Sequence, residues 1–150
     1  MRKFEAVKQD CIKYGVSSVT LPVRSTINSA GYDMFSPIDI VVQPNTIETV
    51  FTNVKAICNP DEFIMVCVRS SMGKKGVCLA NEVGIIDSDN YGNPNNDGNI
   101  GVMLKNTSST PFEIKAGDKI AQAIFMKYLV VDDDIPANNI RISGFGSTGK

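Results

Sequence analysis

Two carboxylates spaced two residues apart, Asp87 and Asp89, follow the apolar segment that ends at Ile86 and precede a polar loop. Residues two apart in an extended chain share a face, so the pair predicts a site that binds a cation or divides acid and base work. The chain has no histidine, which leaves Asp or Glu as the general base of any proton transfer. The same stretch, rich in Asp and Asn, is also typical of a β-turn, and the local pattern leaves both interpretations open.

Two other segments have a composition that suits phosphate. In the first, Arg69 is followed by the hydroxyls of Ser70 and Ser71 after a strand-like run, and such groups at the start of a helix can form an anion cradle. The second, 141–150, combines glycines, hydroxyls and cations with a single ring, Phe145. Glycine lets backbone N–H groups approach a ligand, and a ring can stack on a planar base. Taken singly, each segment also fits an exposed turn or a frayed terminus.

The composition excludes several classes of function. The chain has 150 residues and a net charge of −1, which gives one domain with a core and no global attraction to nucleic acid or an anionic membrane. A phosphate site must therefore depend on local cations. No apolar run has the length of a membrane span or of a signal peptide, which predicts a soluble cytoplasmic protein. Four cysteines without a Cys-x-x-Cys pair, in a chain without histidine, exclude the usual zinc sites.

The sequence predicts that the elements which position these residues are short strands. Apolar runs rich in Val, Ile, Thr and Phe alternate with turn signals, which predicts an all-β sandwich or barrel with at most a short helix at Ser70. The runs are Ile38–Val42, Thr46–Val54, Phe63–Arg69, Val77–Leu79, Gly101–Leu104, Phe112–Ile114 and Lys119–Val131. Within the last run, the stretch 120–131 fits helical spacing and a strand buried on both faces equally well.

Taken in order, five segments resemble the motifs of the trimeric dUTP pyrophosphatases (dUTPases). They are Ala30–Met34, Arg69–Met72, Asn81–Asp89, Gly117–Gln122 and Gly144–Gly149. Each motif alone is weak evidence for the family, but five motifs in the family's order with suitable spacing are specific evidence for it. The resemblance implies a dUTPase-like β-barrel or jelly roll over 1–140. It also implies a flexible C-terminal arm, 141–150, that closes the active site of a homotrimer with shared active sites.

The resemblance also implies the reaction and the residues that carry it. The reaction is hydrolysis of dUTP to dUMP and pyrophosphate, with Mg²⁺ held mainly by the triphosphate and water. Asp87 resembles the carboxylate that activates water for attack on the α-phosphorus, and Asp33 resembles the acid linked to the metal through water. The substrate-binding residues implied are, for the phosphates, Arg69, Ser70, Ser71, Gln122, Arg141, Gly146, Ser147 and Thr148, and, for the base and sugar, Asn81, Ile85, Ile86, Tyr91, Gly101 and Phe145.

The chain departs from the family pattern at two places near Asp89. Asn90 stands where the family usually has a Tyr, whose ring lies against deoxyribose and disfavours ribose. Either Tyr91 takes over that role here, or this protein discriminates less strongly against ribose. The stretch 93–97 then lengthens the following loop. Two alternative functions are a dCTP deaminase of the same fold and a nucleotide-gated regulatory module. The second would use 93–97 and 132–134 as contact surfaces for a protein partner.

Overall fold

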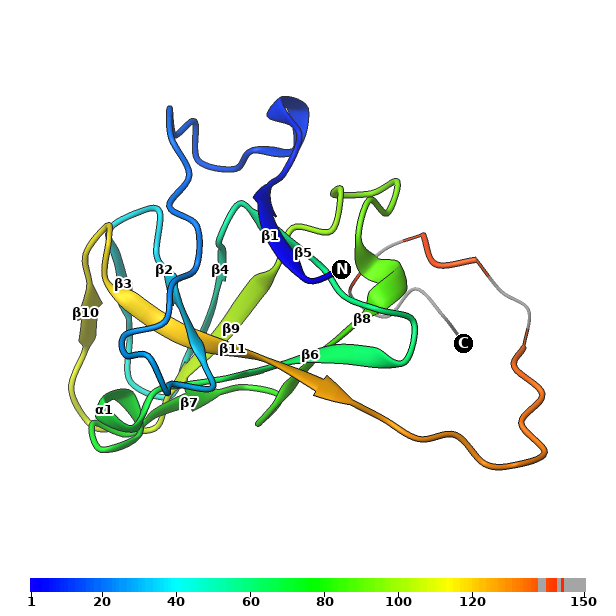
Figure 1. The fold of residues 1–150 in the computed structure, drawn as a ribbon. Coiled ribbons are helices and arrows are strands. Elements are labelled where there is room, and N and C mark those ends of the chain that lie inside the picture. Colours follow the sequence, from blue (N-terminus) through cyan, green and yellow to red (C-terminus); the bar gives the residue numbers. More distant parts are fainter. Residues whose placement is uncertain (138–139, 143, 145–150) are drawn as a thin grey trace.

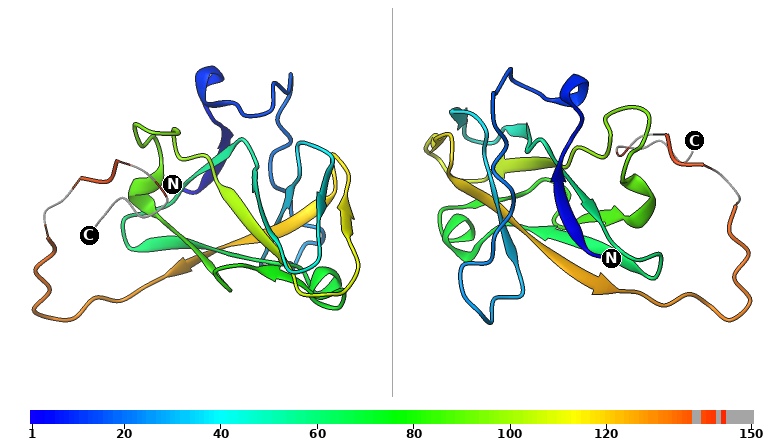
Figure 2. Two further views of the ribbon diagram at one scale, coloured as in Figure 1. Left: turned by 180° about the vertical axis from the view of Figure 1, so that it is seen from behind. Right: turned by 45° about the horizontal axis from the view of Figure 1, so that its top comes forward.

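The computed structural model describes residues 1–137, 140–142 and 144. Phe145, Gly146, Ser147 and Thr148, which the resemblance places on the nucleotide, lie outside the described residues. The described part is dominated by strands that wrap around one core, with a single α-helix of one turn (Figures 1 and 2). This confirms the predicted all-β fold class. None of the helices in these residues is long and apolar enough to cross a membrane.

The strands are mostly short, as turn-punctuated apolar runs require. They are β1 (Lys3–Ala6), β2 (Tyr32–Phe35), β3 (Ile40–Val42), β4 (Ile47–Phe51), β5 (Val54–Ile57), β6 (Glu62–Cys67), β7 (Val77–Leu79), β8 (Gly84–Asp87), β9 (Gly101–Asn106), β10 (Phe112–Ile114) and β11 (Lys119–Lys127). The helix is α1 (Ser70–Gly73), and two 3-10 turns are η1 (Gln9–Cys11) and η2 (Ser88–Asn90).

Two antiparallel sheets form the body of the barrel. One has the strand order β2-β11-β6-β8, and the other has the order β4-β9-β7. Two further antiparallel pairs are β1-β5 and β3-β10. The long strand β11 is central to the first sheet, and its register places Gln122 opposite both Asp33 of β2 and Cys67 of β6. The edge strand β8 pairs only with β6, with Asp87 opposite Phe63.

The core follows the two-residue alternation of the strands. On β9, for example, Val102, Leu104 and Asn106 are buried, while the residues between them are partly or fully exposed. The buried apolar side chains form one cluster that includes Met34, Val42, Val50, Ile64, Val77, Ile100, Leu104 and Ile120. Among the buried residues of β9, Asn106 is polar, and it donates to the backbone oxygens of Val42 and Thr110. A satisfied amide in this place ties β3 and β9 together.

The structure refines three predicted elements. The ambiguous run Lys119–Val131 is a strand, but it leaves the sheet after Lys127. Thr46–Val54 is not one strand, because Asn53 has φ of 60° and separates β4 from β5. Helix α1 does begin at Ser70. Its N-cap residue is Arg69, and no side chain forms a capping hydrogen bond with the first turn.

Candidate active site

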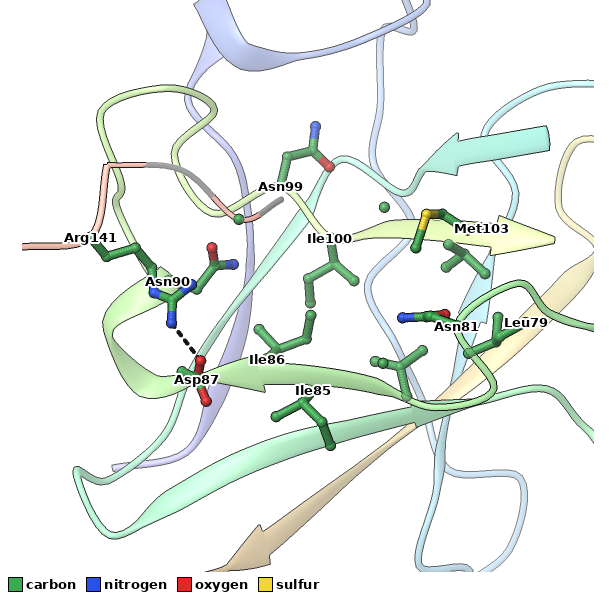
Figure 3. A pocket seen from close by; sticks show the side chains of 15 residues that line it. Leu79, Asn81, Ile85, Ile86, Asp87, Asn90, Asn99, Ile100, Met103 and Arg141 are labelled. Carbon is green, nitrogen blue, oxygen red and sulfur yellow. Dashed lines mark hydrogen bonds and ion pairs between the residues drawn. The ribbon is translucent and has the colours of Figure 1, made fainter. Parts of the chain in front are cut away.

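A pocket opens between the edge strand β8 and the start of β9, where the two sheets separate (Figure 3). Its apolar lining comes from Val66, Leu79, Ile85, Ile86, Ile100 and Val102, and its polar lining includes Asn81, Asp87, Asn90, Asn99 and Arg141. The cavity has a volume of about 100 Å³. Typical small-molecule pockets measure roughly 300–1,000 Å³. The pocket of this one chain therefore suits a single ring more than a complete nucleotide.

Asp87 ends β8 at one side of this pocket and leaves half of its side chain exposed. The guanidinium of Arg141 bridges the two acids of the predicted pair. Its Nη2 lies 2.5 Å from Oδ2 of Asp87, and its Nε lies 2.5 Å from Oδ1 of Asp89. Oδ1 of Asp87 accepts no hydrogen bond from any described residue. The arginine thus fixes the carboxylate in orientation and leaves one oxygen available to a water molecule or a ligand.

Four other predicted residues line the pocket from different elements. Asn81 comes from the turn after β7, Ile85 and Ile86 come from β8, and Gly101 begins β9. Side chains alternate along β8, so Ile86 turns toward Ile100 while Ile85 points to the other face of the strand (Figure 3). Ile86 packs against the core, whereas Ile85 is largely exposed. The apolar wall that a planar ring would meet is therefore Ile86 with Ile100.

A second polar cluster surrounds Asp33 on β2. This carboxylate is almost completely buried, and it accepts a hydrogen bond of 2.5 Å from the hydroxyl of Ser25. Arg69 Nε lies 3.1 Å from one of its oxygens, and Lys119 Nζ lies 2.8 Å from the other. Burial alone would raise the pKa of Asp33. The bonds from Lys119 and Ser25 and the charge of Arg69 outweigh burial and lower that pKa.

Two cations therefore share one carboxylate, which leaves a net positive charge at this cluster. Arg69 and Lys119 are each about one-third exposed, and Ser70 and Ser71 are exposed beside Arg69 at the start of α1. Gln122 lies on the same face as Asp33, because the two are cross-strand partners. Of the predicted phosphate-binding side chains, Arg69 and Gln122 therefore lie beside Asp33, and Ser70 and Ser71 follow Arg69 in α1.

The two clusters stand at opposite ends of β6. Asp87 pairs with Phe63 near the start of this strand, whereas Arg69 follows its end. Six residues of extended chain span roughly 20 Å at about 3.3 Å per residue. Within one chain, Arg69 and Asp87 are therefore too far apart to contact the same phosphate group of a bound ligand.

Tyr91 does not line the pocket. Its hydroxyl donates to Glu5 at 2.6 Å, and Lys55 Nζ lies 4.6 Å from its ring centre, so its side chain lies toward β1 and β5. Asn90 occupies the pocket wall instead (Figure 3). The inserted stretch 93–97 also turns inward: Asn93, Asn96 and Asp97 are buried. This burial leaves little of the loop for the partner surface that the regulatory alternative requires.

No group of three or more acidic or thiol side chains forms a metal centre among the described residues. Both oxygens of Asp33 are already occupied by cations and a hydroxyl. Direct coordination of a metal by Asp33 would have to displace these partners. Carboxylate oxygens do suit Mg²⁺, which usually keeps several waters and binds through substrate phosphates. The donor set therefore fits a metal that arrives with a phosphate ligand and meets the protein through water.

Three residues of the two clusters were not singled out from the sequence. Ser25 and Lys119 hold Asp33, and Asn99 lines the pocket. Lys119 lies inside the Gly117–Gln122 segment, so the motif offered a signal for it. Ser25 carries no such signal, because only the fold brings the loop before β2 against the start of β11.

The fold and the pocket together describe an all-β, nucleotide-binding type of protein with a carboxylate at its site. The dUTPase family model matches residues 17–149. This chain belongs to the dUTPase family. The deoxyuridine 5′-triphosphate nucleotidohydrolase of Lactococcus lactis is 37% identical over 99% of this chain and 98% of its own length. That of Histophilus somni is 35% identical over 87% of each chain.

Solved structures agree with this assignment. The crystal structure of dUTPase from Streptococcus mutans superposes with a TM-score of 0.74 at 34% identity, and the match covers 86% of this chain and 98% of the other. The D95N mutant of dUTPase from phage phi11 of S. aureus, described for the coordination of a structural Mg(II) ion, has a TM-score of 0.70 at 18% identity. That match covers 93% of this chain and 98% of the other. At that identity the likeness concerns the fold alone.

Proposed function

We propose that this protein hydrolyses dUTP to dUMP and pyrophosphate, with Asp87 as the catalytic base. The observation that carries the proposal is the half-exposed Asp87 carboxylate at the side of a ring-sized apolar pocket, in a chain that belongs to the dUTPase family. Phosphoryl transfer requires positioning and charge neutralisation more than covalent chemistry. A chain without histidine can run this reaction through one aspartate.

The step begins at the oxygen of Asp87 that Arg141 leaves unoccupied. A water molecule donates a hydrogen bond to Oδ1 and is deprotonated as its oxygen forms a bond to the α-phosphorus. The bond from the α-phosphorus to the bridging oxygen breaks on the opposite side, and pyrophosphate leaves with the electron pair. Arg141 holds Oδ2 of Asp87 and thereby fixes the direction from which the water attacks.

The base is bound at the apolar end of the pocket. Ile86 and Ile100 contact the faces and edge of uracil, and Asn81 and the backbone of Gly101 offer hydrogen-bonding groups to its polar edge. A close wall excludes the methyl group of thymine by steric overlap. Steric exclusion is the effective route, because attraction distinguishes a single methyl group only weakly.

The phosphates are bound by Arg69, Ser70, Ser71 and Gln122 of a neighbouring subunit. This assignment is supported by the separation of roughly 20 Å between Asp87 and Arg69 along β6, which is too long for both residues of one chain to contact the same phosphate group. Each site of the homotrimer then combines Asp87 of one subunit with Arg69 of the next. Arg141 and the residues after it belong to the arm that covers the nucleotide.

A Mg²⁺ ion would be held mainly by the oxygens of the triphosphate, and Asp33 would contact it only through water. When bound, the ion neutralises charge on the phosphate oxygens. Asp87, Asp89 and Arg141 together carry a net negative charge, which would repel a free triphosphate. Arg69 and Lys119 supply the protein's own neutralising charge, because Asp33 cancels only one of them.

The test is an assay of pyrophosphate release across dUTP, UTP, dTTP and dCTP with Mg²⁺. We expect rapid release from dUTP and little from dTTP or dCTP. Release of ammonia from dCTP would show that attack occurs on the base and would replace this proposal with the deaminase alternative. Equal turnover of all four nucleotides would contradict the proposed base pocket.

A further inference from the structure

The start of β9 forms one side of the pocket, and residues on both sides of Asn53 hold it in place. The side chain of Ile100 lies at the pocket wall (Figure 3). Its backbone oxygen accepts hydrogen bonds from the N–H and the hydroxyl of Thr52, each at 3.0 Å, and its N–H donates to the backbone oxygen of Val54 at 2.9 Å. The ladder between β4 and β9 ends at the pair that includes Gly101. The position of this wall therefore depends on the turn that separates β4 from β5.

Asn53 is the central residue of that turn, and it is completely buried. Its φ of 60° lies in the left-handed region, which asparagine adopts more readily than most residues. Asn53 and Asn99 form a reciprocal pair. The backbone N–H of Asn53 donates to Oδ1 of Asn99 at 2.9 Å, and Nδ2 of Asn99 donates to Oδ1 of Asn53 at 3.2 Å. Because Asn99 directly precedes Ile100 and also lines the pocket, this pair fixes the point at which the chain enters the pocket wall.

The N-terminal segment 7–14 holds the same pair from the other side. Oδ1 of Asn53 accepts from the backbone N–H of Lys13 at 2.8 Å, and Nδ2 of Asn53 donates to the backbone oxygen of Lys13 at 3.1 Å. Nδ2 of Asn99 also donates to the backbone oxygen of Cys11 at 3.3 Å. The two amides thus tie together three segments that are far apart in the sequence.

The N-terminal segment also contacts the end of β4. The hydroxyl of Tyr14 accepts a hydrogen bond of 3.0 Å from the backbone N–H of Phe51, the residue that pairs with Gly101. The segment lies before the residues that the family model matches, so the family motifs assign it no part in the site. Its contacts nevertheless reach the strand ends that support the pocket.

The consequence for the ligand follows from the burial of these amides. Moving one partner of a buried hydrogen-bonded pair leaves polar groups unsatisfied, so the pair resists displacement. Without the Asn53 side chain, the start of β9 can shift. A shift moves the Ile100 wall and turns the backbone groups of Gly101 that meet the polar edge of the base. Small errors in the position of a bound substrate lower turnover strongly.

We propose that Asn53 is a positioning residue for the base, and that the N-terminal segment 7–14 acts with it. Together they set the start of β9 and hence the fit of the pocket to uracil over cytosine. Asn53 is not among the described residues that line the pocket, so its effect is transmitted through Asn99 and Ile100. The inference rests on the proposed function, because it takes the ligand to be a uracil nucleotide.

The test compares Asn53→Gly with Asn45→Gly. The first removes the amide, and glycine keeps a φ of 60° without strain. Asn45 also has a φ of 60°, but it is exposed, and its side chain forms no hydrogen bond among the described residues. It lies before β4, at the end of that strand away from Gly101. The measurements are kcat and KM for dUTP and dCTP, with thermal unfolding of each variant.

We expect Asn53→Gly to raise KM for dUTP by about tenfold, the effect of about one hydrogen bond, with kcat within about twofold. The ratio of kcat/KM for dUTP to that for dCTP should fall by a similar factor, because a loosened backbone discriminates less between the two polar edges. Asn45→Gly should match wild type in both. An Asn53→Gly variant that is less stable but keeps the wild-type KM and ratio has lost structural support alone, and this result overturns the proposal.

Tyr14→Phe provides the test if Asn53→Gly does not fold. Tyr14 is exposed, so loss of its hydroxyl should leave the fold intact while it removes one contact between the N-terminal segment and β4. A fall of about threefold in the ratio for dUTP over dCTP supports the proposal. An unchanged ratio overturns it.

Calorimetric binding of dUMP and dCMP separates this inference from the proposed function. If the wild-type protein releases no pyrophosphate but prefers dUMP, and Asn53→Gly weakens that preference, hydrolysis is refuted and the role of Asn53 is retained. If the wild-type protein hydrolyses dUTP and Asn53→Gly keeps its preference for uracil, the reverse holds. A wild-type protein that neither hydrolyses dUTP nor binds dUMP would refute both.

Discussion

At the scale of single residues, Asp87 is the group on which the proposed chemistry depends. Asp87→Asn keeps the shape of the side chain but removes the base, so turnover of dUTP should fall by about 10²–10⁴-fold. Binding of dUMP should change little, because the pocket wall at Ile86 and Ile100 is untouched. Steady-state kinetics and calorimetry measure the two effects separately.

Asp89→Asn is the matched control for this variant, because Asp89 shares Arg141 with Asp87 from two residues away. It should reduce turnover far less, since it only loosens the arginine. Near-normal turnover in Asp87→Asn would show that another group activates the water.

At the scale of elements, the backbone just before β2 packs against a side chain of β11 without room for a further side chain. A Cβ at Gly31, just before β2, would lie 2.3 Å from Oε1 of Gln122 and 3.1 Å from its Cβ. Gly31→Ala should therefore displace the Gln122 side chain. We expect kcat/KM to fall about tenfold with a modest loss of stability, because the far end of a long side chain can move.

Gly73→Ala in α1 is the control for this change, since a Cβ at Gly73 would meet no atom within 4 Å. Kinetics and thermal unfolding of the two alanine variants should be compared side by side. Equal activities would mean that Gln122 does not contribute to binding the phosphates.

At the scale of the whole molecule, the separation of Asp87 from Arg69 predicts complementation between subunits. Asp87→Asn and Arg69→Ala should each be nearly inactive alone. Co-expressed in equal amounts, they should form mixed trimers in which roughly one site in four combines two intact halves. Pyrophosphate release by the mixture checks this, with light scattering to confirm the trimer. A mixture no more active than its components would place the complete site within one chain.

Acid should weaken the fold through Glu62, where β6 begins. Hydrogen bonds from Arg2 outweigh the burial of this carboxylate, and a bond from the backbone of Asn59 adds to them, so its pKa falls from 4.5 to about 2. The unfolded chain therefore takes up the proton first as the pH decreases. The stabilising contribution of Glu62 is complete above about pH 4.5 and is lost as the pH falls to about 2.

Chemical unfolding of wild type and Glu62→Gln across this pH window measures the contribution. The variant should lose less stability than wild type on acidification. Glu113→Gln, on the exposed side of β10, should keep the wild-type slope. If the free energy of unfolding falls equally with pH in wild type and Glu62→Gln, the acid sensitivity arises from other carboxylates.

The sequence by itself determined the fold class and the family. Short β-rich runs between turn residues predicted strands, and Val77–Leu79 and Phe112–Ile114 are strands with those same limits. The five ordered motifs indicated the family, which the match over 17–149 confirms. Local pattern is sufficient here because alternation and turn chemistry act over a few residues.

Only the tertiary structure decided which of these residues meet. Asp87 and Arg69 are both motif residues, yet the antiparallel register of β6 sets them at opposite ends of one strand. The sequence also could not show whether Tyr91 or Asn90 lines the pocket. Tyr91 is held by Glu5 and Lys55, and Asn90 is held by Asn93, and these partners lie in separate segments of the chain. Long-range pairing and side-chain packing settle such questions, and neither is encoded in the spacing of neighbouring residues.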